Sequence, residues 1–151
     1  MARHRGRAGA ALRSTGRNDE YYTPPWLFAE LALTFDLDVA APAGGVPWVP
    51  AAASFTRERD GLAQEWRGRV WMNPPFSNPT PWVDRFLAHG HGVALLPCSK
   101  ARWFERVWSE APAIAFPGTR LSEAFAIYMP TFLAACGEDC VAAIGRTGPV
   151  R

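Results

Sequence analysis

The chain has 151 residues, of which 48% are hydrophobic and 20% charged, and its net charge is +2. This composition is typical of one globular domain and excludes an intrinsically disordered chain. No apolar run approaches the ~18–20 residues of a membrane-spanning helix, so we expect no membrane partner.

The charge is unevenly distributed along the chain. Residues 1–17 contain five arginines and no acidic residue, whereas the other 134 residues contain 11 basic and 14 acidic residues. We therefore expect a flexible basic arm over residues 1–19 and a single domain over residues 20–151. The abundance of arginine over lysine fits either selection for phosphate contacts or a GC-rich coding sequence.

The start of the chain has no apolar core segment, so we expect no secretory signal. Three cysteines, Cys98, Cys136 and Cys140, are an odd number, which favours reduced thiols and a cytoplasmic location.

Helix and strand signals alternate through the first half of the chain. Thr23 is the expected N-cap of a helix in which Phe28, Leu31 and Phe35 share one apolar face. Strands are expected over residues 36–41, 52–56 and 69–72, and a helix over residues 81–87.

Strand signals cluster in the second half. The apolar run 93–96 suits a buried parallel strand, and Ser99 is expected to cap a helix that reaches Ser109. Short strand-like runs follow at residues 113–116, 124–129, 132–135 and 141–144. This order predicts an α/β fold whose sheet is parallel at its centre, with antiparallel C-terminal strands.

Two groups of residues have the spacing of metal ligands. Cys136 and Cys140 lie four apart, and His89 and His91 flank Gly90. Neither group has a second ligand pair at a familiar spacing, and we see no acidic residue near the histidines in the sequence. We therefore expect a solvated histidine turn and no metal site.

The residues most informative about chemistry are Asn73, Pro74, Pro75 and Phe76, at the carboxyl end of a predicted strand. Open α/β sheets place their ligands at this end. The exocyclic amine of a nucleobase is a poor nucleophile, because its lone pair is delocalised into the ring. The Asn73 side-chain carbonyl and the Pro74 carbonyl can accept its two N–H bonds and localise that lone pair, while Phe76 can stack on an extruded base.

The same four residues have a structural interpretation. Two consecutive prolines end a strand without any catalytic role, and Phe76 would then pack in the core.

Four segments in order resemble the phage-type Dam family of DNA N6-adenine methyltransferases. They are YYTPPWLFAEL, FDLDVAAPAGG, RDGLAQEWRGRVWMNPPFSNPTPWV and VALLPCSKARWF, with a weaker continuation in PGTRLSEAF. The resemblance implies a Rossmann-like sheet that uses S-adenosylmethionine. It also implies a phage or prophage product inside a bacterial host.

The resemblance assigns roles to individual residues. It implies that Asn73 to Phe76 form the catalytic loop and that Asp60 accepts from the amino group of the cofactor. The other cofactor-binding residues that it implies are Thr23, Pro24, Asp38, Ala40, Ala41, Gly61 and Leu62.

The sequence departs from the family in three ways. The FxGxG glycine pattern is absent, and residues 41–45, APAGG, occupy its place. Phe76 replaces the tyrosine of many relatives, which keeps the aromatic face and removes a hydroxyl. The short spacing from Asp38 to Asn73 predicts a trimmed version of the fold with no separate target-recognition domain.

We therefore expect methylation of the N6 amine of adenine in DNA, with double-stranded DNA as the substrate. Arg57, Arg102 and Arg120 are the candidate nucleic-acid contacts of the body. The alternatives are N4-cytosine, RNA or a protein glutamine as substrate, a non-catalytic nucleic-acid-binding domain, or a structural protein in which the motif is fortuitous.

Overall fold

The computed structural model describes residues 22–118, 120 and 130–151. The expected arm over residues 1–19 and the expected strand over residues 124–129 lie outside the described residues. The strands of the described part are β1 Phe35–Ala41, β2 Ala51–Thr56, β3 Val70–Met72, β4 Gly92–Pro97, β5 Ala113–Ala115 and β6 Thr131–Cys136. Its helices are α2 Pro25–Leu31, the 3₁₀ helix η1 Gly61–Ala63, α3 Thr80–His89, α4 Arg102–Glu110 and α6 Glu138–Ile144.

The described strands form one six-stranded sheet in the order β2-β1-β3-β4-β6-β5. The pairs β1–β2, β1–β3 and β3–β4 are parallel, whereas β6 runs antiparallel to both β4 and β5. This confirms the predicted α/β class, with a parallel centre and antiparallel C-terminal strands. The mixed sheet is compatible with a Rossmann-like methyltransferase fold.

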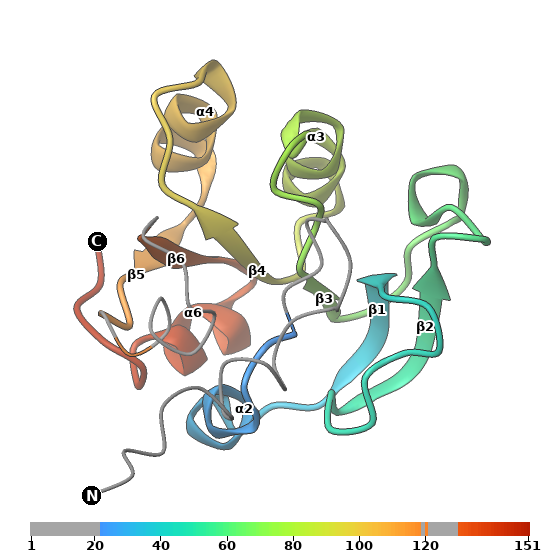
Figure 1. Cartoon of the computed structure of the whole chain (residues 1–151). Coiled ribbons are helices and arrows are strands. Elements are labelled where there is room, and N and C mark those ends of the chain that lie inside the picture. Colours follow the sequence, from blue (N-terminus) through green and yellow to red (C-terminus); the bar gives the residue numbers. More distant parts are fainter. Residues whose placement is uncertain (1–21, 119, 121–129) are drawn as a thin grey trace, which may run out of the picture.

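Helices cover both faces of the sheet (Figure 1). Helices α3 and α4 pack on one face, where Val83, Phe86, Trp103 and Val107 join buried strand residues. Helices α2 and α6 pack on the other face. Because both its faces are covered, every residue of β4 is buried, which explains its uninterrupted apolar sequence.

The face of α2 and α6 has an aromatic core. Phe28 of α2 contacts Trp71 of β3 edge to face, with ring centroids 4.8 Å apart, and Phe35 of β1 lies 5.7 Å from Trp71. Phe35 therefore shares the core of Phe28, as its spacing predicted, but from the first position of a strand and not from the helix.

The beginning of α2 differs from the prediction. Pro24 is the N-cap, and no side chain caps the helix. Proline is tolerated at this end of a helix because the first backbone donors have no intrahelical partner. The prediction of Thr23 as N-cap was wrong, and its hydroxyl makes a different contact, described below.

Two later elements also differ. Helix α4 begins at Arg102 with Ala101 as N-cap, and the Ser99 hydroxyl accepts from the Ala101 N–H at 3.0 Å within the preceding loop. Residues 141–144, predicted as a strand, belong to α6. Gly137, with φ of 91°, follows β6 and is the N-cap of α6. Glu138 and Asp139 fall in the first helical turn, where the helix dipole favours acidic side chains.

No helix within residues 22–118, 120 and 130–151 has both the length and the apolar character that a bilayer crossing demands.

Candidate active site

The connectivity of the sheet reverses at β1. From β1 the chain passes to β2 on one side and then to β3 on the other, and all three strands are parallel. Ligands of open α/β sheets bind in the crevice outside the carboxyl ends of the strands at such a switch point.

A pocket lies at this point. It encloses about 780 Å³, a volume that includes its open mouth. Its walls come from the carboxyl ends of β1 and β2, from the segment before β3 and from the loop after β3. The lining residues are Tyr22, Val39, Ala40, Ala41, Pro42, Phe55, Thr56, Arg57, Asp60, Gly61, Asn73, Pro75 and Trp82.

The middle of β1 contributes a buried acid. Asp38 is 4% exposed and accepts from the Ala40 N–H at 3.3 Å. Burial raises the pKa of Asp38 to about 7, and the Ala40 N–H opposes this only in part. Asp38 lines two smaller cavities, one of which also contains Ala40 and Asn73.

The segment from Asp60 to Leu62 folds back onto β1. The Asp60 carboxylate accepts from the Leu62 N–H at 3.2 Å, which begins η1. A Cβ atom on Gly61 would lie 1.9 Å from the Val39 carbonyl oxygen, so only glycine permits this approach. The Trp66 indole donates to the Gly61 carbonyl at 2.8 Å, and Arg85 of α3 donates to the Leu62 carbonyl.

The Asn73–Phe76 loop follows β3 directly. Asn73 and Pro75 line the pocket, and the Asn73 side-chain oxygen is buried. The Asn73 amide nitrogen donates to the Thr23 hydroxyl at 3.4 Å. Residues 23 and 73, which are fifty apart in the sequence, therefore meet beside the pocket.

The structure brings most of the predicted site residues together. Ala40, Ala41, Asp60, Gly61, Asn73 and Pro75 line the main pocket, and Thr23 and Asp38 line the small cavity beside it. Four predicted residues line none of these cavities: Pro24, Leu62, Pro74 and Phe76. Pro24 and Pro74 are buried, while Leu62 and Phe76 are half-buried.

The sequence analysis missed the aromatic wall of the pocket. Phe55 lies next to the last residue of β2, Trp82 lies in α3, and Tyr22 precedes α2. Trp82 is half-buried: it packs against the α3–α4 core and also lines the pocket. The two prolines beside it, Pro79 and Pro81, mark the start of α3 but do not indicate that Trp82 faces a pocket.

The three candidate DNA-binding arginines have different surroundings. Arg57 follows β2 at the rim of the pocket, and Arg102 is exposed at the first position of α4. Arg120 forms two hydrogen bonds with Glu30 of α2, at 2.8 and 3.0 Å, and its guanidinium lies 4.2 Å from the Trp26 ring centroid.

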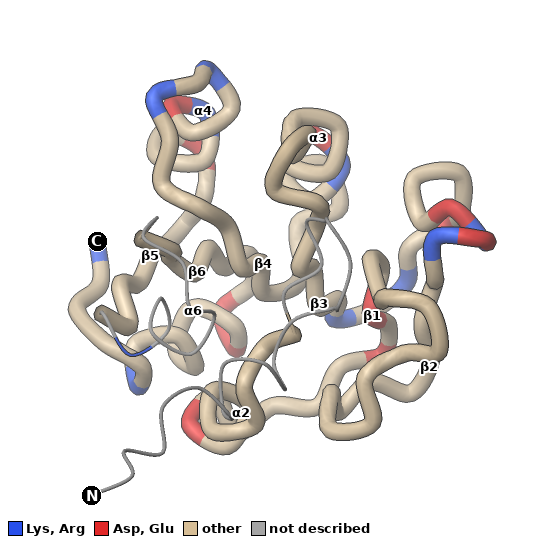
Figure 2. Tube along the Cα trace, in the orientation of Figure 1, with Lys and Arg blue, Asp and Glu red and all other residues tan. Residues whose placement is uncertain are grey.

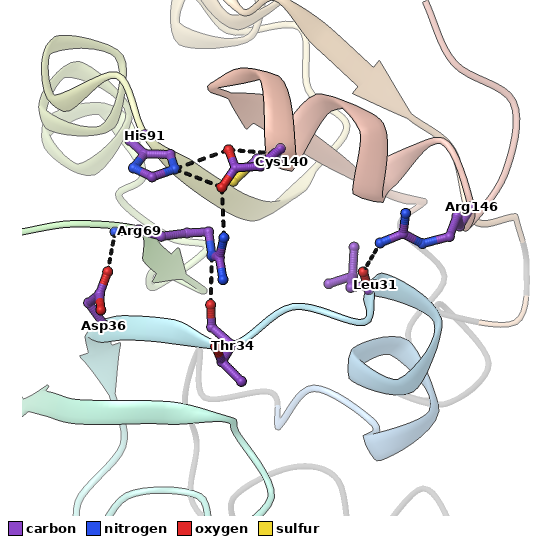
Figure 3. A network of polar contacts seen from close by, with 8 residues as sticks. Leu31, Thr34, Asp36, Arg69, His91, Cys140 and Arg146 are labelled. Carbon is purple, nitrogen blue, oxygen red and sulfur yellow. Dashed lines mark hydrogen bonds and ion pairs between the residues drawn. The ribbon is translucent and has the colours of Figure 1, made fainter.

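The histidine turn is not a solvated loop without acids. His89 contacts the Gly68 carbonyl at 2.7 Å, and His91 contacts both oxygens of Asp139 at 3.0 Å. Figure 3 shows His91, Arg69 and Cys140 arranged around one carboxylate, that of Asp139.

The contacts around the Asp139 carboxylate do not favour a metal ion there. His91, Asp139 and Cys140 have potential ligand atoms within 4.8 Å of one another, but the Arg69 guanidinium already lies 2.7 Å from the Asp139 carboxylate. All three cysteines, which lie in the described part of the chain, are free thiols, and burial raises the pKa of Cys136 to about 11.

Comparison with known proteins identifies the family. Residues 12–126 match the family described as DNA N-6-adenine-methyltransferase (Dam). The chain is also 33% identical over 109 residues to a DNA N-6-adenine-methyltransferase of Haemophilus phage HP1 (strain HP1c1). This match covers 65% of the chain and 61% of that relative, so the chain spans about three-fifths of the relative's length. With three-quarters of its residues inside the matched region, the chain belongs to the DNA N-6-adenine-methyltransferase (Dam) family.

Proposed function

We propose that this protein transfers a methyl group from S-adenosylmethionine to the N6 amine of adenine in DNA, using the Asn73–Phe76 loop. One observation carries the proposal. Asn73 and Pro75 line the same pocket as the carboxyl ends of β1 and β2, at the switch point of the sheet. A methyl donor and a base amine held at this edge would meet beside Asn73.

The pocket suits this cofactor. Val39, Phe55 and Trp82 offer apolar and aromatic surface to an adenine ring, and Asp60 offers a carboxylate at the rim. Asp38 offers a second, buried carboxylate next to Asn73, which suits the cationic amino group of a methionine moiety. When bound there, the cofactor supplies an electrophilic methyl group.

The residues of the loop would activate the target amine. The Asn73 carbonyl oxygen and the Pro74 carbonyl accept its two N–H bonds, which localises the lone pair on nitrogen. Pro74 and Pro75 restrict the loop, so these acceptors are already oriented before the base arrives. Phe76 provides an aromatic face on which the extruded base stacks.

The family favours DNA as the substrate, and two arginines lie where they could contact it. Arg57 follows the carboxyl end of β2, and Arg102 lies five residues beyond that of β4, so both emerge at the edge of the sheet that holds Asn73. Figure 2 shows basic and acidic residues side by side on the loop after β2, and positive charge at one end of α4. Arginines placed there can contact phosphates on either side of an extruded base.

The test is methylation by the purified protein with labelled S-adenosylmethionine and separate DNA, RNA and protein substrates, followed by nucleoside and amino-acid analysis. We expect N6-methyladenine in double-stranded DNA. Label found in N4-methylcytosine, in RNA or in methylglutamine would contradict adenine in DNA as the substrate and identify the substrate that is methylated instead. A protein that gives no heat on titration with S-adenosylmethionine would be a binding domain without turnover.

Asn73→Ala tests the role of the loop. Removing a preorganised transition-state acceptor lowers rates by about 10²–10³-fold, so we expect a loss of this size in kcat. The cofactor dissociation constant should change much less, because Asn73 is proposed to act on the target amine. A folded Asn73→Ala protein that methylates DNA at the wild-type rate would rule out this mechanism.

A further inference from the structure

Thr23 connects two parts of the site that are far apart in sequence. Its side chain is 2% exposed, and its hydroxyl accepts from the amide nitrogen of Asn73 at 3.4 Å. Its backbone carbonyl accepts from the indole N–H of Trp48 at 2.6 Å. Trp48 lies in the loop between β1 and β2, so Thr23 lies between that loop and the Asn73–Phe76 loop.

Trp48 and its loop are held in place by packing and by backbone hydrogen bonds. The Trp48 ring packs against the α2–α6 core and meets the Tyr22 ring edge to face, with centroids 6.4 Å apart. The loop itself is closed by backbone hydrogen bonds from Gly45 to Pro42 and from Val49 to Val46, at 2.9 and 3.1 Å. A buried threonine held from its carbonyl side in this way presents its hydroxyl at a fixed position.

The position of the Asn73 side chain decides how it meets a base amine. The Thr23 hydroxyl can donate or accept, so its contact holds the Asn73 amide in place without choosing which end of the amide faces the pocket. Since Asn73 lines the pocket, a displaced side chain would leave the amine without an aligned acceptor.

We propose that Thr23 is a positioning residue, held by Trp48, whose hydroxyl holds the Asn73 side chain in place beside the target amine. This inference rests on the proposed function and deepens it. The family resemblance implied that Thr23 binds the cofactor. The proposal instead gives Thr23 a role in the chemical step.

The experiment compares Thr23→Val, which keeps the shape and removes the hydroxyl, with Thr23→Ser, which keeps the hydroxyl. A hydrogen bond of ordinary strength corresponds to about a tenfold rate effect. We expect Thr23→Val to lower the single-turnover methylation rate at saturating cofactor and DNA by about tenfold. The cofactor dissociation constant should stay within about twofold of wild type, and Thr23→Ser should recover most of the rate.

Thr147→Val is the matched control. Thr147 is another buried threonine, and its hydroxyl bonds to the Ile144 carbonyl at the end of α6. This variant should lose stability without losing single-turnover rate. A weaker cofactor affinity with an unchanged rate in Thr23→Val would overturn the proposal and make Thr23 a cofactor contact. Equal losses in Thr23→Val and Thr23→Ser would make it a purely structural residue.

A second measurement does not depend on activity. The side-chain amide resonances of Asn73 can be assigned in a ¹H–¹⁵N spectrum by their loss in Asn73→Asp. We expect them to shift in Thr23→Val and to stay near their wild-type positions in Thr23→Ser and Thr147→Val. Unshifted resonances in Thr23→Val would overturn the positioning role. An inactive wild-type protein that still shows the shift would instead refute the proposed function.

Discussion

At the residue scale, the most unusual group is the Asp38 carboxyl. Burial raises its pKa from 3.8 to about 7. The folded protein therefore keeps this proton between about pH 4 and 7, while the unfolded chain has released it. In that window the folded state binds more protons than the unfolded state, so the contribution of Asp38 to stability falls as the pH rises.

We expect Asp38→Asn to remove this pH dependence. At pH 8 the buried charge costs the wild type up to about 4 kcal/mol, and at pH 4 it costs almost nothing. The variant should therefore gain stability relative to wild type as the pH rises from 4 to 8. Urea unfolding of both proteins across this range measures the difference, and a difference that does not vary with pH would contradict the assignment.

Gly61 is the residue whose size decides the shape of the pocket. In Gly61→Ala the new methyl group would meet the Val39 carbonyl, a backbone atom that no rotamer change can move. We expect a loss of about 3 kcal/mol, which lowers the melting temperature by roughly 6–12 °C. Because η1 forms one wall, cofactor affinity should also fall, by about tenfold or more.

Calorimetry with and without S-adenosylmethionine measures both effects of Gly61→Ala. Ala63→Ser is the control, since Ala63 is exposed at the other end of η1. Wild-type stability and affinity in Gly61→Ala would mean that η1 does not need its close approach to β1.

At the scale of elements, α6 is attached to the sheet through Asp139. His91 contacts this carboxylate from the start of β4, and Arg69, just before β3, donates to it while also donating to the Thr34 carbonyl before β1 at 2.6 Å (Figure 3). Desolvation raises the pKa of Asp139, but the hydrogen bonds from His91, Arg69 and the Cys140 N–H outweigh it. The pKa is held well below its usual value.

Asp139→Asn should therefore destabilise the protein at neutral pH. A carboxylate with a lowered pKa contributes stability above about pH 4 and loses it as the pH falls further. The Asp139 side chain is 39% exposed and screened by solvent, so we expect about 1 kcal/mol at pH 7. The difference from wild type should shrink below pH 4 in denaturant titrations.

Glu138→Gln is the control for Asp139→Asn. Glu138 lies in the same first turn of α6, so the change removes a similar charge from the helix end without touching the Asp139 network. It should cost only a few tenths of a kcal/mol. Equal losses in the two variants would mean that the helix dipole, and not the network, accounts for the effect.

At the scale of the whole molecule, the charge distribution constrains how the proposed DNA substrate is attracted. The body after residue 17 is net negative, so attraction must come from local arginines or from the five arginines of residues 1–17. Each phosphate contact contributes about −0.9 to the slope of log affinity against log salt on double-stranded DNA. Deleting residues 1–17 should flatten this slope by about four to five units if all five arginines touch phosphates, and by about two if they engage in part.

The single-turnover rate on saturating DNA should survive this deletion, because no residue of 1–17 belongs to the proposed catalytic loop or cofactor segments. DNA binding of the full-length and truncated proteins across a salt series measures the effect. Identical slopes would show that the arm does not hold DNA.

The sequence by itself determined the features that depend on local patterns. The buried strand at residues 92–97 was predictable because its apolar run is continuous, and the end of β3 because two prolines cannot extend a ladder. The order of elements predicted a parallel centre with antiparallel strands after it. Short apolar runs carried less information, because four residues such as 141–144 fit a strand or one helical turn equally well.

Only the tertiary structure decided which distant residues meet. The strand order places β1 between β2 and β3, so that Asp38 and Asn73 line one cavity. The close approach of Gly61 to Val39 and the contact of Thr23 with Asn73 join segments that no local periodicity relates. Whether Trp82 belongs to the core or to the pocket depends on how α3 is rotated on the sheet. That rotation results from packing across the whole layer, which residue spacing along a single helix does not encode.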